Sequence, residues 1–114
     1  MKQVKIERLN DLFREEISYI LFTEVKDNNV KYVTITDVEI TNDLSFAKVY
    51  FTVRNKEYLE QTQKALNRAS SFIRGKLSER VEVRHTPELR FIFDESIEYG
   101  QKIEKILEQI NEEE

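Results

Sequence analysis

Basic side chains gather in one stretch of the chain, in the pattern expected of a surface that binds phosphate. Seven cations and only three acidic residues lie between positions 64 and 90, and clustered lysine and arginine are the partners that nucleic-acid phosphates need. The alternative is an ordinary solvated helix face, which also carries such residues. The candidate cations are Lys64, Arg68, Arg74, Lys76, Arg80, Arg84 and Arg90.

Groups able to catalyse bond chemistry are scarce. The chain has no cysteine and a single histidine, His85, which excludes thiolate zinc sites and Cys–His pairs. The adjacent carboxylates Asp94 and Glu95 point in different directions on a regular element, and a helix cap explains them better. The two glycines, Gly75 and Gly100, stand alone and form no phosphate-binding loop. We therefore expect no catalysis, no cofactor, no metal and no small-molecule substrate.

Three small residues, Ala69, Ser70 and Ser71, fall inside an otherwise strong helix pattern. Serine hydroxyls can bond back to the preceding helical turn and bend the helix. A kink at these three residues would expose backbone groups beside Arg68 and Arg74, so Ser70 and Ser71 join the candidate RNA-binding residues. The alternative is a straight helix with two small exposed side chains.

The composition is typical of one small domain. The 114 residues are 39% hydrophobic and 35% charged, with a net charge of −4, and this length suits a single core. No apolar run approaches the ~20 residues that span a bilayer, and the first residues match no targeting signal. We expect a cytoplasmic protein without a membrane partner. Residues 44–93 hold ten basic and five acidic side chains, whereas residues 94–114 hold two and eight.

The spacing of apolar residues predicts the first four elements. Steps of three and four residues indicate amphipathic helices, and alternation with β-branched residues indicates strands. The alternation changes phase in the first strand, which predicts a bulge near Thr36 and Asp37. A short turn-forming segment makes the two strands an antiparallel hairpin. The predicted elements are a helix over 3–22, strands over 32–40 and 46–53, and a helix over 56–77.

The last part of the chain predicts one more strand region and one more helix. Alternating apolar residues indicate a strand region over 80–93, which Pro87 divides into two pieces. Because proline cannot donate a hydrogen bond to a neighbouring strand, we expect Pro87 at a sheet edge or at the start of a strand. Asp94 then begins a final helix. We predict an α+β fold with a three-stranded sheet and helices on one face. Residues 1–114 form a single domain, in which 111–114 are a frayed acidic end.

Six short segments, taken together and in this order, resemble one known family. They are Val-Lys-Asp (25–27), Thr-Ile-Thr-Asp-Val-Glu (34–39), Asp-Leu-Ser-Phe-Ala-Lys-Val-Tyr (43–50), Ala-Leu-Asn-Arg-Ala-Ser-Ser-Phe-Ile-Arg (65–74), Thr-Pro-Glu-Leu-Arg-Phe (86–91) and Asp-Glu-Ser-Ile (94–97). Over residues 4–110 the chain resembles ribosome-binding factor A, a family of bacterial ribosome-assembly factors.

The resemblance implies a type II KH-like fold, consistent with the predicted order of elements. In the family an Ala-x-Gly kink interrupts the second helix and replaces the Gly-x-x-Gly loop of ordinary KH domains. The matching positions are Ala69, Ser70 and Ser71, with serine where the family usually has glycine. The family's Lys-Asp-Pro-Arg after the first helix is Lys-Asp-Asn-Asn at 26–29 here, which lacks the proline and one cation.

The resemblance also implies a function. It is association with free small (30S) ribosomal subunits and non-catalytic assistance to late maturation and 5′-end processing of 16S rRNA, linked to growth in the cold. One alternative is a protein-interaction module whose acidic C-terminal helix docks a basic ribosomal or other partner. Another is an enzyme built around His85. No apolar stripe is left over in the pattern, so we expect a monomer.

Overall fold

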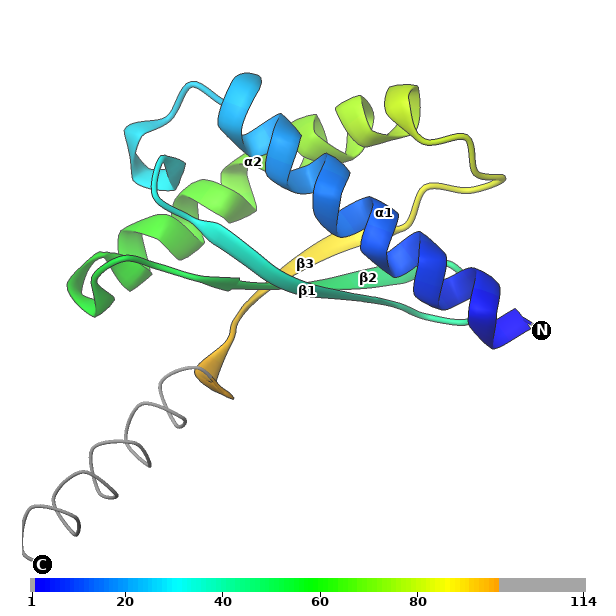
Figure 1. Cartoon of the computed structure of the whole chain (residues 1–114). Coiled ribbons are helices and arrows are strands. Elements are labelled where there is room, and N and C mark those ends of the chain that lie inside the picture. Colours follow the sequence, from blue (N-terminus) through cyan, green and yellow to red (C-terminus); the bar gives the residue numbers. More distant parts are fainter. Residues whose placement is uncertain (1, 97–114) are drawn as a thin grey trace, which may run out of the picture.

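The computed structural model describes residues 2–96, and in residues 2–5 the backbone only. It confirms the predicted α+β fold with one three-stranded sheet, and it adds two short 3-10 helices, η1 and η2 (Figure 1). The elements in order are α1 (Lys2–Thr23), η1 (Asn28–Val30), β1 (Thr34–Ile40), β2 (Phe46–Thr52), η2 (Lys56–Tyr58), α2 (Leu59–Arg80) and β3 (Glu88–Phe93).

The three strands form a mixed sheet in the order β1-β2-β3. The predicted hairpin is confirmed, because β1 and β2 pair antiparallel with Val38 opposite Val49. β3 lies parallel to β2, with Phe91 opposite Val49. Parallel neighbours need a crossover connection, and α2 provides it. The crossover places α2 across the sheet, on the same side as α1 (Figure 1).

The core lies between the two helices and the sheet face that they cover. Strand alternation turns every second residue of β2 toward the helices. These residues are Ala47, Val49 and Phe51, and all three are fully buried. Burying a side chain of valine or leucine size contributes about 1.5–3 kcal/mol. The main contributors are Phe13, Ile17 and Ile20 from α1, Ala47, Val49 and Phe51 from β2, and Leu66, Ile73 and Leu77 from α2.

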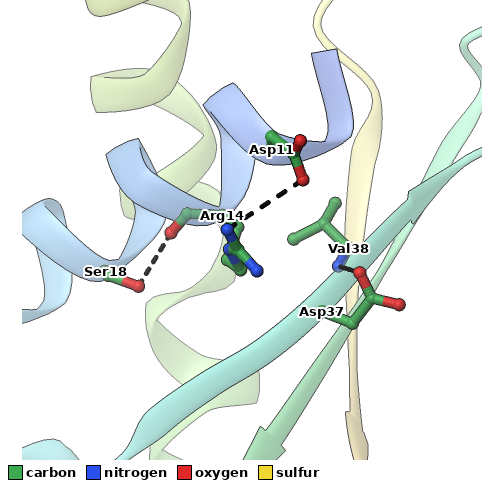
Figure 2. Close-up of polar contacts among 5 residues, drawn as sticks. All are labelled: Asp11, Arg14, Ser18, Asp37 and Val38. Atoms are coloured by element: carbon green, nitrogen blue, oxygen red, sulfur yellow. Dashed lines mark hydrogen bonds and ion pairs between the residues drawn. The ribbon is translucent and has the colours of Figure 1, made fainter. Parts of the chain in front are cut away.

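The predicted bulge in β1 is confirmed. The pairing register shifts between Ile35 and Asp37, so the strand keeps Ile35 and Val38 on the buried side despite the odd spacing. Figure 2 shows the Asp37 carboxylate turned back along the strand, where it accepts the Val38 amide at 2.9 Å. Arg14 of α1 lies beside this part of β1 (Figure 2). The bulge therefore allows the apolar residues on both sides of it to point toward the same core.

The predicted strand region over 80–93 is wrong in its first part, because the strand begins only at Glu88. α2 continues to Arg80, and residues 81–87 form a loop without ladder pairing. Val81 is buried and Val83 packs against the core, so their alternation reflects a loop that packs inward. Pro87 is fully buried directly before β3, which confirms its predicted place at a strand start.

The described part of the chain ends just after β3. The Asp94 amide donates to the Phe51 carbonyl at 2.8 Å, and its carboxylate accepts the Ser96 amide at 3.0 Å, as a helix cap does. The predicted final helix and the acidic end at 111–114 lie outside the described residues. Within those residues no helix combines the length and apolar character needed to cross a bilayer.

Candidate nucleic-acid interface

The solvent side of α2 combines cations with residues that have little or no side chain. Lys64, Arg68, Ser71 and Gly75 follow one another at steps of three and four residues, and all are exposed. A Cβ added at Gly75 would meet no atom within 4 Å, so the helix backbone is approachable there. We call these four residues the cationic face of α2. Such a surface suits a phosphate backbone, which binds through charge at close approach.

Both cations of this face have acidic partners. Lys64 Nζ lies 3.3 Å from Glu60 Oε1, one turn earlier, and Arg68 Nη2 lies 3.6 Å from Asp27 Oδ2. The two cationic side chains remain 67% and 64% exposed. Exposed ion pairs contribute only about 0–1 kcal/mol, so an RNA phosphate can replace either carboxylate. The i,i+4 spacing of Glu60 and Lys64 was visible in the sequence, whereas the partner of Arg68 required the tertiary structure.

Arg74 has a structural role that the sequence did not reveal. Its Nε and Nη2 both donate to the Thr86 carbonyl, at 3.1 and 2.8 Å. The two bonds hold the loop before β3 against α2. Arg74 also borders a shallow hollow of about 330 Å³ together with Ser71 and Ser78. The guanidinium therefore already has a hydrogen-bond acceptor within the fold, which reduces its availability to another partner.

Lys76 and Arg80 also have partners at the C-terminal end of α2. Lys76 Nζ lies 3.9 Å from Glu79 Oε2. The Arg80 guanidinium donates to Glu16 of α1 and lies 4.3 Å from the centroid of the Tyr19 ring. The hydrogen bond to Glu16 raises the pKa of Arg80 above its ordinary value. Arg80 thus links α1 to α2 in addition to carrying charge.

Arg90, one of the candidate cations, lies apart from the cationic face of α2. This side chain alternates with buried Leu89 and Phe91, so it faces the side of the sheet away from α2, 3.9 Å from the centroid of the Phe46 ring. Arg84 lies exposed in the loop before β3 and has no ion pair or hydrogen bond with another described residue. The structure brings Lys64 and Arg68 together and separates Arg90 from them.

α2 runs through Ala69, Ser70 and Ser71 as one helix, without the predicted interruption. The Ser70 hydroxyl does not bond back to its own helix; it donates to the Leu89 carbonyl of β3 at 3.2 Å. Its small size suits the close packing of α2 on β3. Ser71 is exposed on the cationic face of α2. This segment therefore offers the Ser71 hydroxyl to a partner and continues the helix without a break.

The groups considered for catalysis do not converge. His85 lies exposed in the loop before β3 and makes no hydrogen bond within residues 2–96. The Asp94 carboxylate accepts bonds from the Ser96 hydroxyl and from the Thr36 hydroxyl of β1, which lower the pKa of Asp94 below its usual range. No group of three potential metal ligands occurs in the part of the chain that the structure describes. These side chains serve as caps or lie in solvent.

Comparison with known proteins supports the resemblance. The family model described as ribosome-binding factor A matches residues 5–107. The chain belongs to the ribosome-binding factor A family. Ribosome-binding factor A of Staphylococcus epidermidis is 46% identical over 112 residues, which cover 97% of each chain. The family member of Halothermothrix orenii is 41% identical over 115 residues, which cover 100% of this chain and 94% of that one.

Solved structures of ribosome-binding factor A share the fold. The crystal structure from Thermus thermophilus has a TM-score of 0.69 at 24% identity, covering 76% of this chain and 93% of that one. The solution structure of a putative member from Thermotoga maritima has a TM-score of 0.65 at 25% identity, covering 75% and 82%. A model of the Thermus factor fitted into a cryo-electron microscopy map of its 30S complex has a TM-score of 0.58 at 27% identity, covering 78% and 90%.

Proposed function

We propose that this chain binds the free small (30S) ribosomal subunit and assists maturation of its 16S rRNA, including processing at the 5′ end, without bond chemistry of its own. Membership of the ribosome-binding factor A family supports this, as does the Thermus family member fitted into a map of its 30S complex. We further propose that it acts in the cytoplasm as a monomer and supports growth in the cold.

The observation that carries the proposal is the cationic face of α2. Lys64 and Arg68 are held toward solvent by weak ion pairs, and the backbone at Gly75 is approachable between them and the end of the helix. Phosphates of one rRNA segment displace Glu60 and Asp27 from these cations. A factor that binds one RNA arrangement more tightly than others raises its population, which is sufficient to guide maturation.

Co-sedimentation with small subunits, large subunits and joined ribosomes tests the proposal. The Lys64→Glu/Arg68→Glu variant places two carboxylates where phosphates would bind, so its affinity for small subunits falls roughly tenfold or more. Arg74 is left intact because it holds the loop before β3. The matched control is Arg8→Glu/Lys48→Glu, which changes the net charge equally at exposed positions of α1 and β2. Circular dichroism confirms that both variants fold.

The outcomes separate the alternatives. Loss of small-subunit binding in the α2 variant alone supports the proposal, and equal loss in the control variant indicates unspecific charge attraction. Binding that survives the α2 reversal moves the contact elsewhere and favours docking of a basic protein partner by the acidic C-terminal segment. Absence of small-subunit binding by the unmodified chain contradicts the proposal.

A further inference from the structure

A hollow of about 480 Å³ lies where η1, the β2–η2 connection and the start of α2 meet. Figure 1 shows these segments at one end of the molecule. The volume falls in the range of small-ligand sites. Tyr32 and Tyr58 both line the hollow and remain 58% and 52% exposed. Half-exposed aromatic rings on the wall of a hollow are the surfaces on which unpaired nucleobases stack.

Three side-chain amides line the same hollow without a partner. The amides of Asn28, Asn29 and Gln61 make no hydrogen bond to any residue within the described range. Each offers a donor and an acceptor on one planar group. The edges of nucleobases present donors and acceptors in the same way, and unstacked bases are read through them. The wall thus combines stacking surfaces with groups able to recognise a base edge.

The charge of the hollow also favours RNA. Its lining includes no carboxylate, whereas Arg54 contributes a guanidinium 5.3 Å from the centroid of the Tyr32 ring. Lys31 adds a second cation 5.7 Å from the same centroid. A positive, aromatic and amide-lined hollow attracts a nucleotide with its phosphate, whereas its positive charge disfavours a basic peptide.

Hydrogen bonds hold the η1 wall of the hollow in place. The buried Thr62 hydroxyl, from a residue only 3% exposed, donates to the Asn29 carbonyl at 3.0 Å. The Asp27 carboxylate accepts the Asn29 backbone N–H at 3.0 Å. Because η1 is held by these two hydrogen bonds, little conformational entropy is lost when a ligand enters. Asp27 also pairs with Arg68 of the cationic face of α2, so the two surfaces adjoin.

We propose that this hollow receives an unpaired nucleobase of the RNA whose phosphates lie on the cationic face of α2. The base stacks on a tyrosine ring, Tyr32 or Tyr58, and its edge is hydrogen-bonded by the amides, with Gln61 on the side of α2. This inference rests on the proposed function and adds a ligand class to it, which is single-stranded rather than duplex RNA.

Fluorescence anisotropy tests the hollow with labelled oligo-A, labelled oligo-U and an RNA duplex of equal length. Tyr32→Ala and Tyr58→Ala in the full chain each remove a half-exposed ring, and the variant that lacks the stacking ring loses about tenfold in single-strand affinity. Duplex affinity stays unchanged. Tyr32→Phe keeps the ring and the affinity, and Gln61→Leu reduces the difference between the two oligonucleotides. Phe22→Ala removes an 88% exposed ring elsewhere and has no effect.

The readout separates this inference from the proposed function. Full single-strand affinity in both tyrosine-to-alanine variants overturns the nucleobase site, even where small-subunit binding depends on Lys64 and Arg68. Equal losses for single strand and duplex also overturn it, because a stacking pocket does not act on paired bases. Nuclear magnetic resonance gives a second readout: the side-chain amide signals of Asn28, Asn29 and Gln61 shift on addition of oligo-A or oligo-U. Shifts caused by a peptide and not by either oligonucleotide would assign the hollow to a protein partner.

Discussion

The cations of α2 differ in what the fold loses when they bind another group. Lys64 and Arg68 give up exposed ion pairs, each with a contribution of about 0–1 kcal/mol. Arg74 would give up two hydrogen bonds that hold the loop before β3, and Arg80 would give up its bond between the two helices. Of these four cations, only Lys64 and Arg68 can exchange their partners freely, so RNA contact is expected there.

The Asp94 carboxylate is predicted to stabilise the fold. Its carboxylate bonds Ser96 and Thr36, and its pKa is lowered in the folded chain. Asp94→Ala therefore lowers the free energy of unfolding at neutral pH by about 1 kcal/mol, as loss of a helix cap does. Urea unfolding followed by circular dichroism measures this change.

The pH dependence of the Asp94 effect has a definite sign. A lowered pKa means that the unfolded chain binds more protons near pH ~4, so this stabilisation is complete above the unfolded pKa of ~3.9. It is lost as the pH falls through the folded pKa. The Asp94→Ala variant therefore loses less stability on acidification than the unmodified chain does. Asp43, whose pKa is also lowered, is present in both proteins and cancels in the comparison. Parallel pH profiles would contradict this role of Asp94.

α2 is the element that connects the core to the candidate interface. Its buried side fills the core, while Gln63 and Ser70 donate to the Phe91 and Leu89 carbonyls of β3, at 2.9 and 3.2 Å. β3 is an edge strand, and side-chain donors from a helix are one way to cover such an edge. The small residues of α2 thus serve contact with the sheet on one side and an open surface on the other.

Gly75 is predicted to lower the stability of α2. Glycine within a helix is about 1 kcal/mol less favourable than alanine, and a Cβ at this position meets no atom within 4 Å. Gly75→Ala is therefore expected to raise the free energy of unfolding by about 1 kcal/mol, measured by thermal or urea unfolding. A lower stability would show that this part of α2 contacts something other than solvent.

The whole molecule separates its charges along the chain. It carries a net charge of −4, yet residues 44–93 hold ten basic and five acidic side chains. The field of exposed charges is screened beyond about 10 Å at 0.1 M salt, so a local cationic surface can bind RNA on an acidic protein. The same screening makes such binding depend on salt.

A salt titration tests this property of the whole molecule. The logarithm of the affinity for small subunits is expected to fall linearly with the logarithm of salt concentration, because phosphate contacts release counterions. The Lys64→Glu/Arg68→Glu variant has a slope shallower by about 2, one for each phosphate contact removed. Equal slopes in the variant and the unmodified chain would place the phosphate contacts on other residues.

The sequence by itself determined α1, α2, the hairpin, the bulge at Asp37 and the strand start at Pro87. These features depend on local periodicity and backbone preference, which neighbouring residues specify. The alternation of Leu89, Arg90 and Phe91 also implied that Arg90 faces away from α2, although we grouped it with the cations of the helix. Local pattern was insufficient for residues 81–87, because an inward-packed loop alternates as a strand does.

Only the tertiary structure decided which cations are available and where a base could enter. Arg74 and Thr86, Arg80 and Glu16, and Thr62 and Asn29 are pairs that the fold brings together from different elements. The hollow beside Tyr32 and Tyr58 likewise combines three separate segments of chain. Contacts between residues distant in sequence depend on how elements pack, and the periodicity of a single element does not specify that packing.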